Sequence, residues 1–198
     1  PGPGEVLLKV EAATICGTDL RIVSGAKSAG VRPGVIMGHE IAGRVHSVGA
    51  GVDESLVGKQ AAVAIVVSCN HCRACLAGRE HLCPNAELFG YAIDGGLAEY
   101  VLVPAKAVAQ GNLITTTIEV KPTHLALAEP LSCVLNGFEQ YRVRPGDTAV
   151  VLGAGAIGLL HTQLIRLAGA SQVIVTNRSE ARRDVALRLG ATHVVAPD

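Results

Sequence analysis

Short apolar or alternating runs fill the first half of the chain, and turn residues separate them. The segments EVLLKVEA, IAGRVHSVG, QAAVAIVV and LAEYVLVP each alternate or stay apolar, which predicts β-strands. Gly and Pro recur between these runs, as expected of turns. The pattern from Glu5 to about Val103 therefore predicts an all-β domain or barrel, with a short helix after Cys16.

After about Lys121 the spacing of apolar residues changes from that of strands to that of helices. The segment THLALAEPLSCVLNGFEQYRV has helical spacing, and Pro130 is expected to kink or interrupt it. The next residues read TAVVLGAGAIGLLHTQLIRLAGASQVIVTNRSEARRDVALRLGATHVV, in the order strand, Gly-rich turn, helix, strand, helix, strand. This order predicts a βαβαβ unit with a parallel sheet, and the boundary between the two halves lies within residues 110–147.

Composition and charge exclude several classes of protein. The longest unbroken aliphatic run, Ala61 to Val67, is far shorter than the roughly 20 residues of a membrane-spanning helix. The 17 basic and 17 acidic residues cancel, so nothing predicts a nucleic-acid or anionic-membrane partner. We expect a soluble, cytoplasmic protein. The chain opens PGPGEVLLKV without an initiator Met and stops just after a predicted strand, so we expect both ends to be truncated.

Gly153, Gly155 and Gly158 form the pattern GxGxxG between the strand TAVVL and the helix IGLLHTQLIRLAG. The pattern alone is weak, but between a buried strand and a helix it indicates a dinucleotide site. The first Gly permits the tight turn, the second lets the backbone approach a pyrophosphate, and the third lets helix and strand pack closely. The helix start, with Ala156 and Ile157, then presents N–H groups to the phosphates. The alternative is a tight turn without a ligand.

The end of the next strand, QVIVT, is where such sites select between NAD and NADP. NAD-specific sites usually place Asp or Glu there, about 20 residues after the turn, whereas this chain has Asn177 followed by Arg178. A missing carboxylate removes repulsion against a 2′-phosphate, and Arg178 or Arg182 is suited to pair with it. We therefore expect NAD or NADP and favour NADP. The alternative is that these arginines are solvated surface charges.

Four of the six cysteines, Cys69, Cys72, Cys75 and Cys83, fall within the segment CNHCRACLAGREHLC. Disulfides would need an oxidising compartment, which nothing else in the sequence indicates, and a redox CxxC site would normally be a single pair. The bacterial iron–sulfur run has three residues before its last cysteine, unlike this segment. Four thiolates closing a tetrahedral shell fit a structural zinc ion better.

Cys16, in ATICGTDLR, and His39, in VIMGHEIAG, are further candidates for metal binding. Both side chains suit zinc, and a catalytic zinc needs three protein ligands and an open position. Taken alone, a single Cys or His is more often a structural residue. Their combination with a dinucleotide fold is what favours a metal site.

Together these segments resemble the zinc-dependent medium-chain dehydrogenases, the alcohol and polyol dehydrogenases, in particular the branch of sorbitol and threonine dehydrogenases. The resemblance covers nearly the whole chain, in family order, through GEVLLKVEAATICGTD, GHEIAGRVHSVGAGV, the four-cysteine segment, DGGLAEYV, EPLSC and GAGAIG. It implies that residues 1–122 form a GroES-like (chaperonin-like) β-barrel catalytic domain. Residues 123–198 would form a partial Rossmann NAD(P)-binding domain, and residues from about 69 to 84 the structural zinc lobe.

The resemblance also implies the ligands of a catalytic zinc. Cys16 and His39 match two of them, and Glu40 occupies the adjacent acidic position, at or near the metal. Typical alcohol dehydrogenases take the third ligand from a Cys before the Rossmann strand, where this chain reads LAEPLSC. Glu129 falls near that position, as in the polyol dehydrogenases, whose Glu contacts zinc directly or through water. Cys133 is the competing candidate, and we favour Glu129.

Thr18 matches the family's hydroxyl that hydrogen-bonds the substrate alcohol and relays its proton. The histidine that ends this relay in some alcohol dehydrogenases would fall at Arg21, so the route by which the proton leaves stays open. In such a site zinc acts as a Lewis acid that lowers the pKa of the alcohol, and hydride passes to the nicotinamide.

These expectations define a zinc- and NAD(P)-dependent oxidoreductase acting on a secondary alcohol such as a polyol, sugar alcohol or amino alcohol. Two zinc ions per chain are expected, one catalytic and one structural. The alternatives are an NADPH-dependent alcohol or aldehyde reductase and a catalytically inactive nucleotide-binding relative. Because family members are commonly dimers or tetramers, we expect a homodimer or homotetramer for the full-length protein.

Overall fold

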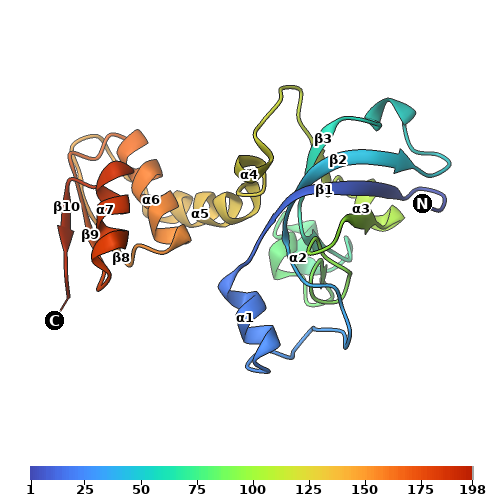
Figure 1. The fold of residues 1–198 in the computed structure, drawn as a ribbon, viewed down its shortest axis with the longest axis horizontal. Helices are drawn as coiled ribbons and strands as arrows, with labels where there is room; N and C mark the ends of the chain where they lie inside the picture. The colour runs from blue at the N-terminus through green and yellow to red at the C-terminus, as the bar shows by residue number, and fades with distance from the viewer. Residues whose placement is uncertain (198) are drawn as a thin grey trace. The chain divides into compact units, whose positions relative to one another are not determined.

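The computed structural model describes residues 1–197, which form two compact units (Figure 1). The first unit is Pro1–Glu129, and the second begins at Pro130. The domain boundary expected from the sequence, between residues 122 and 123, remains a prediction.

The first unit is built on a five-stranded antiparallel sheet in the order β6-β1-β2-β3-β7. Its strands are β1 (Val6–Thr14), β2 (Glu40–Val48), β3 (Gln60–Val63), β6 (Tyr100–Val103) and β7 (Leu113–Thr115). The long β1–β2 pair aligns Thr14 with Glu40. Because the strands are antiparallel, the chain leaving β1 and the chain entering β2 lie at the same end of the sheet.

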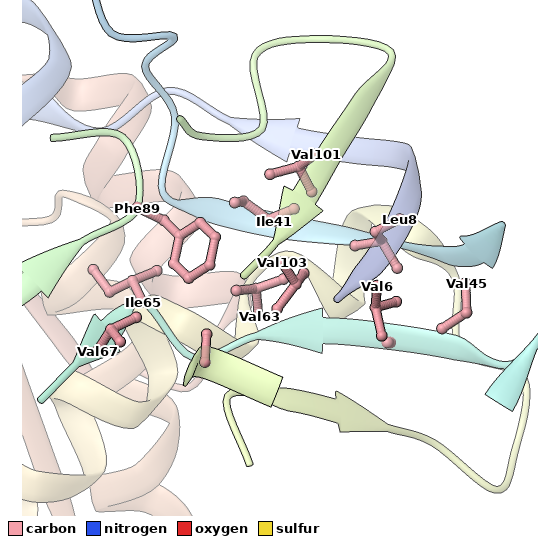
Figure 2. Close-up of a cluster of buried hydrophobic side chains, with 12 residues drawn as sticks. Val6, Leu8, Ile41, Val45, Val63, Ile65, Val67, Phe89, Val101 and Val103 are labelled. Atoms are coloured by element: carbon pink, nitrogen blue, oxygen red, sulfur yellow. The ribbon is translucent and has the colours of Figure 1, made fainter. Parts of the chain in front are cut away.

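Aliphatic side chains around a single phenylalanine form the core of this unit. Figure 2 shows Phe89 beside Ile65 and Ile41, with valines of several strands around them. Alternate residues of β1, Val6 and Leu8, are fully buried, as the two-residue period of a strand requires. Fully burying each such side chain contributes about 1.5–3 kcal/mol to the stability of the fold. The apolar residues whose alternation predicted these strands are therefore also the ones that pack in the core.

Shorter elements connect the strands of the first unit: α1 (Gly17–Val23), η1 (Glu54–Leu56), β4 (Val66–Val67), α2 (Arg73–Leu76), η2 (Glu80–Leu82), β5 (Glu87–Leu88), α3 (Ala105–Ala109) and α4 (Pro122–Leu125). Helix α1 confirms the helix expected after Cys16. The segment QAAVAIVV was expected to be one strand and is two. The ladder is interrupted because Ala64 donates its N–H to the carbonyl of Asn112, whose side-chain amide bonds the carbonyls of Ala64 and Val66.

The second unit is a parallel three-stranded sheet in the order β10-β9-β8. Its elements are β8 (Thr148–Leu152), α6 (Ala156–Leu167), β9 (Gln172–Thr176), α7 (Glu180–Arg188) and β10 (His193–Val195). This order confirms the predicted βαβαβ unit. Val173 and Val175 of β9 are fully buried, with Ile165 of α6 and Ala186 of α7 in the same core.

Pro130 does not interrupt a helix, contrary to the expectation from the sequence. Helix α5 runs over Ala128–Tyr141, so Pro130 is its third residue. In the first turn of a helix the backbone N–H has no intrahelical partner, and a proline is tolerated there. The helical segment is instead divided before α5, at residues 126–127, where α4 has already ended. Among the described residues, no helix has the length and apolar character needed to cross a membrane.

Candidate active site

Three potential metal ligands converge where β1 ends and β2 begins. Cys16 is the N-cap residue of α1, two residues after β1, and His39 immediately precedes Glu40, the first residue of β2. One ligand atom from each of these side chains lies within 4.8 Å of the others. The β1–β2 register, which pairs Thr14 with Glu40, brings these residues together although they are distant in the sequence.

Asp19 faces His39 from the first turn of α1. Its Oδ1 lies 3.5 Å from Nδ1 of His39, both side chains are buried, and neither atom has a hydrogen-bond partner among the described residues. Its Oδ2 accepts a 2.8 Å hydrogen bond from the N–H of Cys16. A carboxylate beside one ring nitrogen leaves the other available as a ligand, which is the usual environment of a metal-binding histidine. Sequence reasoning missed Asp19; its signal was the capping-box position three residues after Cys16.

Glu40 adds a second buried carboxylate. The hydroxyl of Thr14 donates a hydrogen bond to Oε2 of Glu40. Burial raises the pKa of Glu40, the nearby His39 lowers it, and Asp19 raises it. Within residues 1–197, no Lys or Arg forms an ion pair with Glu40 or Asp19. A thiol, an imidazole and two buried carboxylates without a Lys or Arg partner are a donor set that fits a zinc ion.

Thr18 and Tyr91 lie against the same three side chains. Oγ1 of Thr18 lies 3.8 Å from Sγ of Cys16, and the Thr18 and Tyr91 hydroxyls are hydrogen-bonded to each other. The Tyr91 ring centre is 5.4 Å from that of His39. Burial raises the pKa of Tyr91, although the hydrogen bond with Thr18 lowers it. Tyr91 was missed because it is in a loop without a motif.

Glu129 and Cys133 were the two candidates for a further ligand. Glu129 is half-buried at the second residue of α5, and its charge helps to raise the pKa of Tyr91, so it lies in reach of this site electrostatically. It is not one of the three side chains that converge within 4.8 Å. Cys133, one turn further along α5, is exposed. The choice between them remains a prediction.

The four cysteines of the 69–83 segment also converge, between β4 and β5. Sγ of Cys75 lies 3.4 Å from Sγ of Cys72 and 3.9 Å from Sγ of Cys69, and the N–H of Cys69 donates to Sγ of Cys83. Zinc–sulfur bonds of about 2.3 Å in a tetrahedron require sulfurs about 3.8 Å apart. All six cysteines of the chain are free thiols, so the disulfide interpretation finds no support.

The thiols of this segment differ in pKa. The N–H of His71 is the main hydrogen bond that lowers the pKa of Cys69, to about 6. The N–H of Cys75 acts in the same direction on Cys72, but burial and bonding to the neighbouring sulfurs outweigh it and raise the pKa of Cys72 to about 11. Backbone N–H groups that stabilise thiolates around one point are suited to holding a metal ion.

The Gly-rich turn has the geometry that the sequence predicted, with a different reason for each glycine. Gly153 has φ of 103°, which favours glycine. Gly155 is the N-cap residue of α6 with φ of −80°, and a Cβ there would meet no atom within 4 Å. A Cβ on Gly158 would lie 2.0 Å from the carbonyl oxygen of Gly153. Ala156 and Ile157 follow as the exposed first residues of α6.

Asn177 and Arg178 follow β9 directly, and Arg182 lies in the first turn of α7; their role in binding a cofactor remains a prediction. The side-chain nitrogen of Asn177 is buried without a hydrogen-bond partner among the described residues, while Arg178 and Arg182 are exposed. Arg183, which the sequence analysis did not single out, donates to the carbonyls of Asn177 and Arg178. Arg183 therefore shapes the backbone here and leaves Arg178 and Arg182 available for a ligand.

The described residues thus combine a cluster of zinc-type ligands with a strand–GxGxxG–helix unit of the dinucleotide-binding type. Comparison with known families agrees. Residues 2–112 match the model described as "Alcohol dehydrogenase GroES-like domain", and residues 156–198 match "Zinc-binding dehydrogenase". The chain belongs to the zinc-binding alcohol dehydrogenase family. The predicted fold, a GroES-like domain followed by the start of a Rossmann domain, is confirmed.

Three similar proteins illustrate the relationship. The L-threonine 3-dehydrogenase of Thermococcus kodakarensis is 41% identical over all of this chain and 55% of its own length. A protein of Sinorhizobium meliloti 1021 described as a zinc-binding dehydrogenase, solved bound to NADP, is 41% identical with a TM-score of 0.92. An alcohol dehydrogenase of E. coli CFT073, solved with NADH, is 34% identical with a TM-score of 0.89. All of this chain covers 56% of each structure, so it spans about half the length of the proteins it matches.

Proposed function

We propose that the full-length protein is a zinc-dependent oxidoreductase that transfers hydride between a secondary alcohol and NAD(P). The observation that carries the proposal is the convergence of Cys16, His39 and Glu40 within 4.8 Å. The family membership and the strand–turn–helix geometry around Gly155 support the dinucleotide half of the reaction. The relative named for L-threonine, a secondary alcohol with a neighbouring ammonium and carboxylate, makes small polar alcohols the first substrates to test.

The proposed roles follow from the contacts of each residue. Cys16 and His39 would hold the catalytic zinc, with Glu40 and Glu129 as carboxylates at or near it. When bound, zinc supplies Lewis acidity that lowers the pKa of a substrate alcohol. Asp19 would keep His39 oriented with one nitrogen toward the metal.

Thr18 would transfer the proton of the substrate hydroxyl. Its own hydroxyl lies 3.8 Å from the sulfur of Cys16 and is hydrogen-bonded to Tyr91, so its rotation is restricted. A hydroxyl beside the ligand cluster would accept the alcohol proton as it releases its own, by way of the Tyr91 hydroxyl, to water, while hydride leaves for the nicotinamide. The half-buried surroundings of Thr18 and Tyr91 limit access of competing water.

The dinucleotide would lie with its pyrophosphate at the turn of Gly153, Gly155 and Gly158 and at the N-terminus of α6. Arg178 and Arg182, exposed after β9, favour NADP over NAD because a 2′-phosphate would gain two cationic neighbours. The similar structure with NADP supports this preference, and the one with NADH keeps NAD in the test.

Metal analysis and turnover of the full-length protein test the proposal. We expect two zinc ions per chain, one at the catalytic ligands and one at Cys69, Cys72, Cys75 and Cys83, and oxidation of secondary alcohols with NADP or NAD. Cys16→Ser should remove one zinc and the turnover. A protein that holds only one zinc, keeps it in Cys16→Ser and binds neither dinucleotide would instead be the inactive relative.

Paired variants decide the third ligand. Glu129→Gln should lower zinc occupancy of the catalytic site and turnover, whereas Cys133→Ser should leave both unchanged. The reverse result would assign the position to Cys133. Reduction of aldehydes with NADPH, without oxidation of any secondary alcohol, would favour the reductase alternative. Size-exclusion chromatography with light scattering tests the predicted dimer or tetramer.

A further inference from the structure

Lys27 lies against the aromatic side chain that borders the candidate zinc site. Its Nζ is 5.3 Å from the centre of the Tyr91 ring, and the same ring is 5.4 Å from that of His39. Tyr91 also bonds to the hydroxyl of Thr18. The Tyr91 ring therefore lies between the positive charge of Lys27 and two residues proposed to act on the substrate, His39 and Thr18.

A purely structural role for Lys27 would be to fasten its own loop to the loop of Tyr91, but another residue already does so. Arg32 donates its backbone N–H to the carbonyl of Tyr91 over 2.8 Å and its Nε to the carbonyl of Ala92. Its guanidinium also forms an ion pair with Asp94, which in turn accepts from the N–H of Ile36. These contacts fix the two loops without Lys27, whose cation–π contact adds only about 0.5–1 kcal/mol when exposed.

The charge of Lys27 also has no ion-pair partner among the described residues, although the side chain is half-buried. An ammonium without a carboxylate partner in its own chain is available to an anionic ligand. Its position beside the proposed substrate site makes a substrate anion the natural partner.

We propose that Lys27 is a specificity-determining residue that selects secondary alcohols carrying an anionic group, a carboxylate or a phosphate, a few bonds from the reacting hydroxyl. Tyr91 is the positioning residue between the two ends of the substrate. Its ring holds the ammonium of Lys27, and its hydroxyl holds Thr18 at the reacting end. This inference rests on the proposed function and adds the substrate class to it.

The test compares matched alcohols that differ in one anionic group. The full-length enzyme is assayed with 3-hydroxybutanoate against 2-butanol, and with glycerol 1-phosphate against glycerol. We expect the ratio of kcat/KM for the anionic over the neutral alcohol to be about tenfold or more in at least one pair, as for a hydrogen bond to a charged group. The pair that responds identifies carboxylate or phosphate.

Lys27→Met should reduce that ratio about tenfold, mainly through KM, and Lys27→Arg should keep most of it because the charge remains. Lys59→Met, at an exposed lysine after η1, removes the same charge elsewhere and should leave the ratio unchanged. Tyr91→Phe should lower kcat for both members of a pair, because it frees Thr18 while keeping the ring. Binding of Lys27→Met to the same alcohols, measured by calorimetry with cofactor present, should show the same loss for the anionic one.

Two failures are distinguishable. If the wild type contains zinc and oxidises neutral alcohols as well as anionic ones, or if Lys27→Met keeps the preference, the inference about Lys27 is wrong and the proposed function stands. If the wild type oxidises no secondary alcohol and binds none, the proposed function and the inference both fail.

Discussion

Two glycines of the GxGxxG turn should respond in opposite ways to the same substitution. Gly158→Ala should damage the fold and Gly155→Ala should damage only dinucleotide binding. The structure supplies the reason: a Cβ on Gly158 would lie 2.0 Å from the carbonyl oxygen of Gly153, whereas a Cβ on Gly155 would meet no atom within 4 Å.

The size of each effect follows from this geometry. Carbon and oxygen atoms in ordinary contact are more than about 3 Å apart, so Gly158→Ala must push the start of α6 about 1 Å from the turn. Overpacking of this kind lowers the free energy of unfolding by about 1–3 kcal/mol. Gly155 has φ of −80° and ψ of 179°, which alanine adopts without strain. Replacing the N-cap glycine by alanine lowers the free energy of unfolding, and the smaller entropy of the unfolded chain raises it. Each effect is below about 1 kcal/mol, so they nearly cancel.

For dinucleotide binding, we expect Gly155→Ala to be the damaging variant. If the backbone of Gly155 approaches the pyrophosphate closely, a methyl group there displaces the phosphates, and we expect at least about tenfold weaker binding, or about 1.4 kcal/mol. The assays are guanidinium denaturation and titration of NADPH fluorescence, both on the full-length protein. Gly137→Ala, in α5, is a control because its Cβ would make only a 3.5 Å contact with His161; it should leave dinucleotide binding unchanged.

Two outcomes would refute the reasoning. Equal losses of stability in Gly155→Ala and Gly158→Ala would show that the turn does not pack as described. Unchanged NADPH binding in Gly155→Ala would show that no pyrophosphate approaches this residue.

Three further predictions concern the metal and cofactor sites. Asp19→Asn should weaken zinc binding at the catalytic site about 10–100-fold, measured by competition with a chromogenic chelator, because it removes the charge beside His39; wild-type affinity would contradict this role. Arg178→Ala should raise the Kd of NADPH about tenfold with little change for NADH, and equal effects on both would make Arg178 a mere surface charge. A chelator should remove zinc from the four-cysteine segment faster as the pH falls toward about 6, the value to which the pKa of Cys69 is lowered. The reason is that protons compete with zinc for thiolates. A rate of zinc loss that is independent of pH would contradict thiolate ligation.

Features whose residues are neighbours in the chain could be predicted from the sequence. The cysteine segment and the GxGxxG turn carry their geometry in their spacing, because a single loop or turn holds all their residues. The strands of the first unit and the βαβαβ order followed from hydrophobic periodicity in the same way. Local rules misled at Ala64, where the distant Asn112 divided the predicted strand QAAVAIVV. They also misled at Pro130, which lies in the first turn of α5 and does not interrupt it.

The cluster of Cys16, His39 and Glu40 could be predicted only through family resemblance, since nothing in the spacing of Cys16 and His39 places them together. The β1–β2 register does so by pairing Thr14 with Glu40. Tyr91 and Lys27 carried no signal at all, because loop residues acquire their neighbours from the folding of other segments. The fold class, the Gly-rich turn and the cysteine lobe could thus be inferred from local patterns in the sequence. The surroundings of Cys16 and His39 could not, because their contacts join residues that only the paired strands and anchored loops bring together.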